Sequence, residues 1–431
     1  MSESFLKVKN AVQSHHRWKR KCLNLVASEN ITSPSVREMI ISDFLHRYGD
    51  YTRGHPEERD FQGCEYIIDV ELKAIELAKK LFNAEFVDIR PVSGHATVLA
   101  AIVGMTGLGD KVITRSSPDG GHYTALKHGP LNVLGRKPIF FPFNPQEMSI
   151  DVDQSLKLIR EVEPKIVWFG GSVMLFPEPL RELNDASTEV GAKILYDASH
   201  VLGLIAGNQF QDPFSEGADI IIGSTHKTFP GPQKGIILVK DDQTLAERIN
   251  EAVFPTLTDN HHISNVAGLA IALSEMETFG KAYAKQILWN ARALASSLYH
   301  SGFNVLCPDK GFTETHQVVM NVAEIGGGRV IANMLEKANI IATRYMLPGD
   351  KEEHMDKPSG IRIGVSEVTR LGMKEDQMAL IAGMFERLIM KGEDAERVRA
   401  SASALAEDFN TVHYCFDKNA DAYTFFKLIE D

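Results

Sequence analysis

Hydrophobic and polar positions follow two patterns, one in the first part of the chain and another in the rest. Between about residues 69 and 222, long helix-like stretches alternate with short Val/Ile-rich runs at 86–90, 111–114, 166–169 and 194–196. Short continuous apolar runs are typical of strands that are buried on both faces, and the intervening stretches are long enough for crossover helices. The pattern predicts an α/β fold with a mostly parallel central sheet.

The pattern changes after Pro255. A long helical stretch, from about 264 to 301, leads into a segment whose strand candidate lies at 317–322. We therefore expect a smaller C-terminal α+β domain after the sheet domain. The predicted parts are an N-terminal arm (1–30), a large domain (31–285) and a small domain (286–431).

Composition narrows the class of protein. The 431 residues are 44% hydrophobic, which suffices for a large core, and the net charge of -11 is not concentrated in one segment. The absence of a basic stripe argues against nucleic acid and anionic membranes as partners. No apolar run resembles a signal peptide or a bilayer span, so we expect a cytoplasmic protein. The four cysteines are widely separated and predict neither disulfides nor a metal site.

A lysine after a strand-like run is the first candidate for chemistry. The segment 223–228 reads Gly-Ser-Thr-His-Lys-Thr and precedes a Gly/Pro-rich turn. Lys227 could form a Schiff base there beside an anion, which is the chemistry of pyridoxal phosphate. A solvated surface lysine is the simpler interpretation of this motif taken alone.

Residues upstream favour the cofactor. Asp197 ends an apolar strand, where a carboxylate would keep a pyridine nitrogen protonated, and His200 could reach the ring's phenolic oxygen. Ser93 and Gly94 open an Ala-rich helix, and backbone amides at such a turn commonly hold phosphate. The alternatives are a structural histidine and an ordinary capping serine.

These motifs, together with 25–30, Tyr51, 120–122 and 360–364, resemble serine hydroxymethyltransferases in the family's order over nearly the whole chain. The resemblance implies a fold type I PLP-dependent transferase with an aspartate aminotransferase-like architecture. It also implies pyridoxal 5'-phosphate as cofactor, chemistry at the α-carbon of glycine, and a homodimer with shared active sites.

The resemblance also implies roles for single residues. His122 would stack on the pyridine ring and handle the substrate hydroxyl proton. Arg362 would bind the substrate carboxylate, for which a guanidinium offers two parallel donors, unless it forms only a solvated salt bridge. The implied catalytic residues are Lys227, His122, Asp197 and Tyr51; the cofactor contacts are Ser93, Gly94, His95, His122, Ser172, Asp197, His200, His226 and Lys227; the substrate contacts are Ser28, Tyr51, Arg53, Phe61 and Arg362.

Two segments depart from the family pattern. Where the family reads approximately Tyr-Ala-Glu-Gly and has a second tyrosine ten residues on, this chain has Arg53 and Phe61. The family glutamate handles protons in folate-dependent transfer, and arginine cannot replace it because it does not titrate in the useful range. Near the expected pterin pocket, Thr343-Arg344-Tyr345 stands where the family has Asn-Lys-Asn. Both changes count against ordinary pterin binding.

We therefore expect aldol and retro-aldol chemistry at glycine Cα. The preferred activity is that of an L-threonine transaldolase or aldolase, which uses threonine and an acceptor aldehyde and releases acetaldehyde. The segments around Lys227, 315–318 and 348–349 resemble threonine transaldolases, whereas 51–65 is closer to archaeal-type hydroxymethyltransferases. A true hydroxymethyltransferase using tetrahydrofolate or tetrahydromethanopterin and a non-catalytic PLP-binding homologue are the alternatives. Arg53 either grips an anionic acceptor or pairs with a nearby carboxylate.

Overall fold

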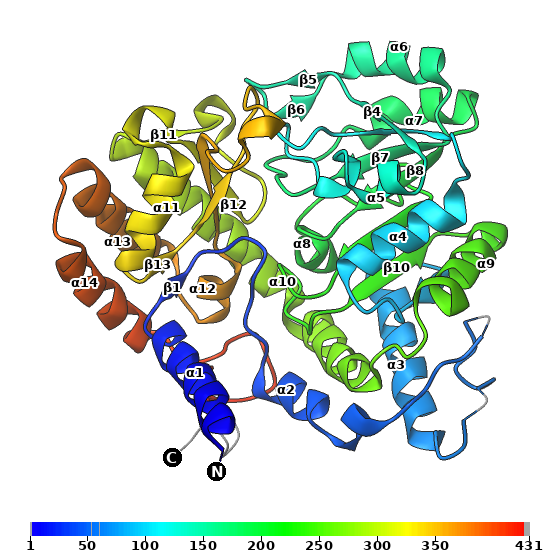
Figure 1. The fold of residues 1–431 in the computed structure, drawn as a ribbon, viewed down its shortest axis with the longest axis horizontal. Coiled ribbons are helices and arrows are strands. Elements are labelled where there is room, and N and C mark those ends of the chain that lie inside the picture. Colours follow the sequence, from blue (N-terminus) through cyan, green and yellow to red (C-terminus); the bar gives the residue numbers. More distant parts are fainter. Residues whose placement is uncertain (1, 53, 60, 426–431) are drawn as a thin grey trace. The chain divides into compact units, whose positions relative to one another are not determined.

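The computed structural model describes residues 2–52, 54–59 and 61–425 (Figure 1). The chain divides into two compact units. We call residues 35–285 and 346–353 the large unit, and residues 1–34, 286–345 and 354–431 the small unit. Each is described by itself.

A seven-stranded sheet forms the centre of the large unit. Its strands, in spatial order, are β2 (Phe86–Asp88), β10 (Gly235–Val239), β9 (Ile220–Ser224), β8 (Lys193–Asp197), β7 (Ile166–Gly170), β3 (Lys111–Thr114) and β4 (Lys137–Phe140). The five strands from β9 to β4 are parallel, and β10 runs antiparallel to both of its neighbours. The predicted fold class, α/β with a mostly parallel sheet, is confirmed. Strands β7 and β9 are buried along their whole length, which explains their unbroken apolar runs.

The edge strand β2 is shorter than the sequence predicts. The expected strand runs to Arg90, but β2 ends at Asp88. The Asp88 carboxylate accepts a hydrogen bond from the Arg90 backbone N–H (2.9 Å), and a side chain that bonds its own backbone two residues on forms a turn.

Helices cover the sheet. Those of this part of the chain are α2 (Pro34–Ile40), α3 (Glu65–Phe82), α4 (Gly94–Met105), α5 (Pro130–Val133), α6 (Val152–Val162), α7 (Leu180–Glu189), α8 (Leu202–Ala206) and α9 (Gln243–Glu251), with a small hairpin of β5 (Phe143–Asn144) and β6 (Ser149–Ile150). The core forms where Ile102 and Met105 of α4 pack with Ile222 and Ile237 of the sheet. Helix α10 (Ile263–His300) matches the predicted long helix and passes from the large unit into the small one.

The small unit is built on a four-stranded antiparallel sheet. Its order is β11 (Asn304–Val305), β12 (Gln317–Asn321), β15 (Gly360–Gly364) and β14 (Thr343–Tyr345). A short parallel pair joins β1 (Leu23–Asn24) to β13 (Ile340–Ile341). The helices are α1 (Glu3–Lys19), α11 (Gly327–Lys337), α12 (Ser366–Arg370), α13 (Glu375–Phe385) and α14 (Ala395–Asp408).

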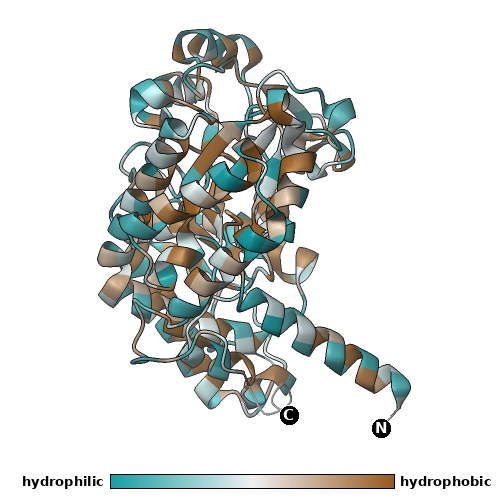
Figure 2. Ribbon diagram, turned by 90° about the vertical axis from the view of Figure 1, so that its left-hand side faces the viewer, coloured by the Kyte–Doolittle hydropathy of each residue, from teal (hydrophilic) through white to brown (hydrophobic). Residues whose placement is uncertain are grey.

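Helix α1 is largely exposed. Gln13 is its buried residue, and in Figure 2 hydrophobic and hydrophilic residues follow one another along the helix. Phe5, Val8 and Val12 are exposed apolar side chains on it. In the part of the chain that the structure describes, no helix combines the length and the apolar character that a membrane crossing requires.

Buried charges gather beside the edge strand β2. Glu71 on α3 forms ion pairs with Arg59 and His261, and Asp88 pairs with Arg90 (2.5 Å). Burial of paired charges is tolerated because each group keeps a partner of opposite sign or a hydrogen bond. We call this set the β2 charge cluster.

Lys234 is a fully buried amine at the same cluster. Its Nζ donates a hydrogen bond to the carbonyl of His261 (2.8 Å). Burial lowers the pKa of Lys234 from 10.5 to about 7, although the charges of Glu71 and Asp88 raise it. Between these pH values the unfolded chain binds a proton that the folded chain releases, so stability rises as the pH rises from 7 towards 10.5.

We therefore predict that Lys234→Met, which keeps an unbranched side chain of nearly the same length and removes the amine, flattens the dependence of stability on pH. Relative to the variant, the wild type should gain about 2–3 kcal/mol of unfolding free energy between roughly pH 7 and pH 9, because one pKa unit corresponds to about 1.4 kcal/mol. Urea unfolding at both pH values measures this. Lys7→Met, at an exposed position of α1, is the matched control and should follow the wild type. Parallel curves for wild type and Lys234→Met would contradict the prediction.

Candidate active site

The carboxyl ends of three adjacent parallel strands form the centre of the candidate site. Gly170 at the end of β7 lies opposite Asp197 at the end of β8, and Asp197 lies opposite Ile222 of β9. Strand β9 ends at Ser224, three residues before Lys227. The register therefore delivers Asp197 and the lysine segment to the same edge of the sheet, as expected for a ligand site in an open α/β fold.

The Asp197 carboxylate is 4% exposed and is held by the turn that follows it. It accepts a hydrogen bond from the Ser199 backbone N–H (2.9 Å), and the Ser199 hydroxyl accepts one from the Ser224 N–H (3.1 Å). These two bonds clamp the end of β8 to the end of β9.

The segment that carries Lys227 is fastened on both sides. Before the lysine, the Thr225 hydroxyl donates to the carbonyl of Pro232 (2.7 Å). After it, the Thr228 hydroxyl donates to the carbonyl of His200 (2.9 Å). Lys227 itself is half-buried, as is His226. Lys227 thus stands on a turn that hydrogen bonds hold on both sides, and the residue is partly exposed.

His122 is the third member of the constellation. It is half-buried, its Nδ1 contacts the Thr124 hydroxyl at 2.6 Å, and its ring centre lies 6.1 Å from that of His95. Burial lowers the pKa of His122; the charge of Asp197 raises it, and Lys227 and His95 lower it further. The imidazole is therefore neutral at pH 7 and can accept a proton.

A glycine turn brings His122 to the end of β7. Gly120 adopts a φ of +92°, a conformation that favours glycine, and its carbonyl accepts a hydrogen bond from the Ser172 N–H (2.8 Å). Ser172 thus lies beside the turn that leads into His122. The family resemblance implies a cofactor contact for each of these two residues separately.

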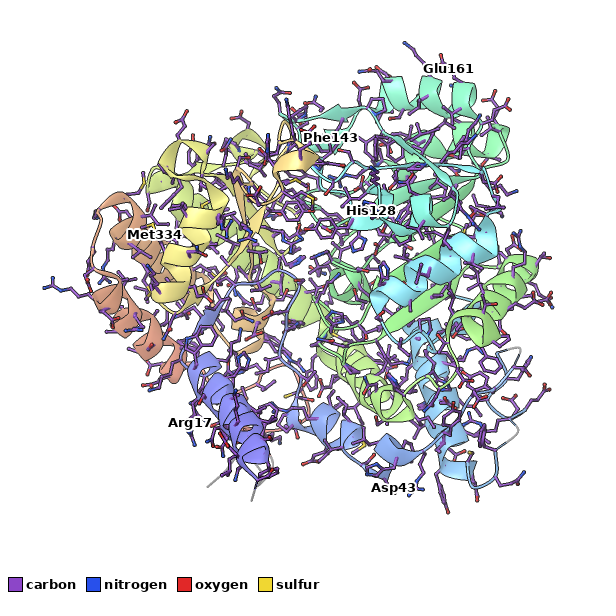
Figure 3. The ribbon with its side chains drawn as sticks, in the orientation of Figure 1. Arg17, Asp43, His128, Phe143, Glu161 and Met334 are labelled. Carbon is purple, nitrogen blue, oxygen red and sulfur yellow. The ribbon has the colours of Figure 1, made fainter. Side chains whose placement is uncertain are left out.

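A buried ion pair that sequence reasoning missed supports this turn. Arg115 donates to the Glu178 carboxylate (2.7 Å) and to the carbonyl of Asp119. Its guanidinium also lies 5.0 Å from the ring centre of Phe143, which Figure 3 labels. The charges of Arg115 and Glu178 are 63 residues apart in the chain, so no local pattern could have revealed the pair.

The first turn of α4 offers an anion-binding end. Ser93 caps the helix by accepting a hydrogen bond from the Ala96 N–H (3.1 Å), and a side chain added at Gly94 would meet the Ser224 hydroxyl at 2.8 Å. The helix start therefore lies against the strand that leads to Lys227. His95, in the same turn, is exposed. Free backbone N–H groups and the helix dipole favour a phosphate at such an end.

These residues fit pyridoxal phosphate. Lys227 supplies an amine, Asp197 a buried carboxylate, His122 a neutral ring, and α4 an end for a phosphate. His200, buried in the segment after Asp197, lies next to the lysine turn through the Thr228 bond. Each group has the chemistry that its predicted role requires.

Tyr51 and Phe61 have other surroundings. Tyr51 is 3% exposed, and its ring centre lies 5.3 Å from the guanidinium carbon of Arg59 and 4.9 Å from that of Arg90, in the β2 charge cluster. Phe61 is 41% exposed, and the centre of its ring lies 5.1 Å from that of Tyr48. The predicted contacts of both with a substrate stay predictions, and Arg53 lies outside the described residues.

Arg362 and Ser28 belong to the small unit. Arg362 lies on β15 and is 5% exposed. The N–H of Gly364, two residues on, donates to the carbonyl of Leu25 (2.9 Å), and His316 contacts the carbonyl of Ala27 at 3.0 Å. The segment that carries Ser28 is therefore fixed beside the end of β15, close to the arginine.

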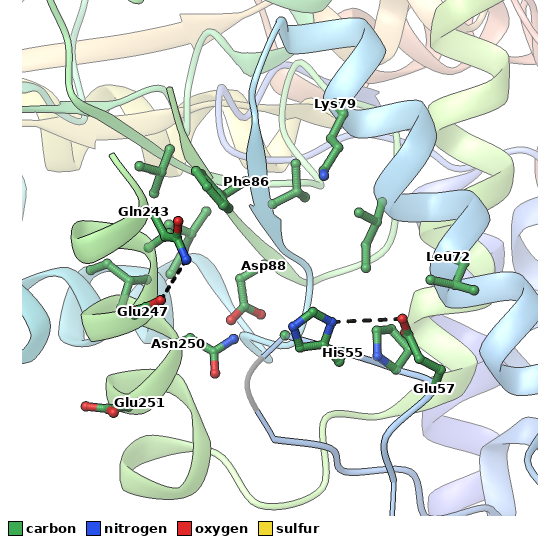
Figure 4. A pocket seen from close by; sticks show the side chains of 18 residues that line it. His55, Glu57, Leu72, Lys79, Phe86, Asp88, Gln243, Glu247, Asn250 and Glu251 are labelled. Carbon is green, nitrogen blue, oxygen red and sulfur yellow. Dashed lines mark hydrogen bonds and ion pairs between the residues drawn. The ribbon is translucent and has the colours of Figure 1, made fainter. Parts of the chain in front are cut away.

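A cavity of about 680 Å³ lies elsewhere in the large unit (Figure 4). Its apolar wall includes Phe86 and Ile237, and its polar side chains include His55 and Glu57, with His55 Nδ1 3.9 Å from Glu57 Oε1. Among the described residues that line it, none is a predicted site residue. Size alone does not make this cavity the active site, because the titratable groups suited to the chemistry gather at the sheet edge.

Known proteins resemble this chain throughout its length. The family model described as serine hydroxymethyltransferase matches residues 1–385. The serine hydroxymethyltransferase of Methanosphaera stadtmanae is 46% identical over 98% of both chains, and that of Methanocaldococcus jannaschii is 48% identical over 94% of both.

A solved structure resembles the fold closely. It is that of an L-threonine transaldolase from Pseudomonas fluorescens in its internal aldimine state, with a TM-score of 0.87 and 30% identity, and the match covers 99% of this chain and 96% of that one. The predicted fold type I architecture and cofactor are confirmed. This chain belongs to the serine hydroxymethyltransferase family of PLP-dependent transferases.

Proposed function

We propose that this protein is a serine hydroxymethyltransferase, which cleaves the Cα–Cβ bond of serine to give glycine and passes the one-carbon unit to a pterin. Archaeal relatives that carry this name are 46–48% identical over almost the whole chain. The transaldolase that we expected from the sequence is supported by a structural neighbour that is 30% identical. The order of the two activities is therefore reversed from our sequence-based preference.

The observation that carries the proposal is the placement of Asp197 and the segment of Lys227 at the ends of adjacent parallel strands, near enough to His122 for their charges to act on its imidazole. Lys227 would hold the cofactor, Asp197 would favour a protonated ring nitrogen, and Ser93 and Gly94 would bind its phosphate. Pyridoxal phosphate, when bound, supplies a sink for the electron pair that bond cleavage leaves at Cα. We assign the remaining cofactor contacts to His95, Ser172, His200 and His226.

His122 is the proposed acceptor for the proton of the substrate's β-hydroxyl. Cleavage requires this proton to leave as the aldehyde forms, and a base must be unprotonated to take it. Burial lowers the pKa of His122, so the neutral ring predominates at pH 7. The same ring can return the proton in the reverse direction.

Arg362 and Ser28 are the proposed ligands of the substrate carboxylate. A bidentate arginine can fix the amino acid so that the bond to be broken stands perpendicular to the cofactor ring. We also propose a homodimer with shared active sites. The exposed apolar side chains of α1, among them Phe5 and Val8, support an association between copies of the chain.

L-Threonine transaldolase is the second candidate. Arg53 stands where the family has a glutamate that handles protons in folate-dependent transfer, and Tyr345 stands in the expected pterin region. Both features favour an acceptor other than a pterin, which would be an aldehyde. The structural neighbour with this activity supports the same possibility.

Product analysis decides between the two activities. We expect the holoenzyme to form glycine from serine in the presence of tetrahydromethanopterin or tetrahydrofolate, at a rate at least tenfold above that without pterin. Mass spectrometry of the products measures this. Lys227→Ala should lose the reaction because it lacks the amine.

Incubation with threonine and a panel of aldehydes is the counter-assay. Pterin-independent release of acetaldehyde with formation of a new β-hydroxy amino acid, at a higher kcat/KM than serine cleavage, would replace our first proposal by the second. Absence of both reactions in a cofactor-loaded enzyme would contradict both.

The pH profile tests the role of His122. Because its pKa lies below the ordinary value of 6.5, kcat/KM should stay level from about pH 7 to pH 8 and fall on the acid side. His122→Asn should lower kcat by roughly 10²–10⁴ and remove this acid limb. His128→Asn, at an exposed histidine labelled in Figure 3, is the matched control and should keep the wild-type kcat and the acid limb. An acid limb that persists in His122→Asn would assign the proton to another group.

A further inference from the structure

Arg362 and Tyr345 lie on the same face of the small unit's sheet. In the antiparallel pair β14–β15, Thr343 is opposite Arg362 and Tyr345 is opposite Gly360. Side chains alternate along a strand, so residues two positions apart share a face. Tyr345 is therefore the diagonal neighbour of Arg362, at a distance that an aromatic side chain can span.

The two side chains stack. The Arg362 guanidinium carbon lies 4.8 Å from the centre of the Tyr345 ring, and the two residues are 5% and 8% exposed. A guanidinium stacked on an aromatic face is held by cation–π attraction, which is stronger where both groups are desolvated. Because stacking uses the flat face of the guanidinium, its N–H donors stay at the edge, where a carboxylate can meet two of them.

The neighbours of Arg362 along β15 explain how the ring fits. Residues 360 and 364, on either side and on the same face, are both glycines and carry no side chain to occupy the space. Tyr345 fills the place beside Gly360. On the other side, the Gly364 N–H donates a hydrogen bond to the carbonyl of Leu25, in the segment that carries Ser28.

We infer that Tyr345 is a positioning residue for the substrate carboxylate. It holds the guanidinium of Arg362 in one orientation from one side, while the segment of Ser28 closes the other. This inference rests on the proposed role of Arg362 in binding an amino acid. It gives Tyr345 a purpose besides the one that the sequence indicated, the exclusion of an ordinary pterin.

The direct test is the binding of glycine to the holoenzyme, measured by the change in cofactor absorbance. We expect Tyr345→Leu, which keeps an apolar side chain and removes the ring, to raise the Kd for glycine about tenfold, with Tyr345→Phe within about twofold of wild type. In serine cleavage, KM should rise with the Kd while kcat changes less. Arg362→Lys, which cannot stack in the same way, should raise the Kd at least as much.

A ligand without a carboxylate separates positioning from general damage to the site. Ethanolamine is serine without its carboxylate, so its Kd should be the same for wild type and Tyr345→Leu. Equal losses of affinity for glycine and ethanolamine would mean that the site as a whole is damaged, and the inference would be wrong. If the wild-type holoenzyme binds no amino acid, the proposed function fails instead.

A fluorinated series keeps the test valid if Tyr345→Leu does not fold. Phenylalanine, 4-fluorophenylalanine and pentafluorophenylalanine at position 345 have similar shapes and progressively weaker negative charge on the ring face. We expect the Kd for glycine to rise along this series and the Kd for ethanolamine to stay constant. A glycine Kd that does not vary along the series would overturn the inference.

Discussion

The parallel register of β7, β8 and β9 is the constraint on which the rest of the site depends. It places Asp197 opposite Gly170 and Ile222. Hydrogen bonds from Ser199 to Asp197 and from Ser224 to Ser199 then hold the turns after β8 and β9 together. A slip of one residue would send the Asp197 side chain to the other face of the sheet. The amine and the carboxylate can work on one ligand because the strands fix them to one edge.

The site residues that follow strands could be predicted from the sequence, because a strand's end is marked by local pattern and parallel strands share an edge. Lys227, Asp197 and His200 are of this kind. The antiparallel direction of β10 could not be predicted in this way, because it depends on how the strand pairs with its neighbours. The early end of β2 could not be predicted either, because it depends on a hydrogen bond from the Arg90 N–H to the Asp88 side chain. The buried partners Arg115 with Glu178 and Glu71 with His261 come from distant segments, and only the folded chain brings them together.

The residues that we propose for the site belong to both units, which the sequence suggests only through resemblance. Groups for cofactor chemistry lie in the large unit, and Arg362 with Ser28 lies in the small one. The stacking of Arg362 on Tyr345 explains how a residue that departs from the family pattern can serve a function that the family retains. The comparisons identify the family, and positions 53 and 345, which depart from the family pattern, bear on our proposal for the acceptor.

The central claim is that Lys227 is the amine that holds the cofactor. Reduction of the holoenzyme with borohydride, followed by proteolysis and mass spectrometry, fixes the cofactor to the lysine that carried it. The account predicts a pyridoxyl group on Lys227 and on no other lysine. A pyridoxyl group on another lysine, such as the buried Lys234, or on none, would contradict it.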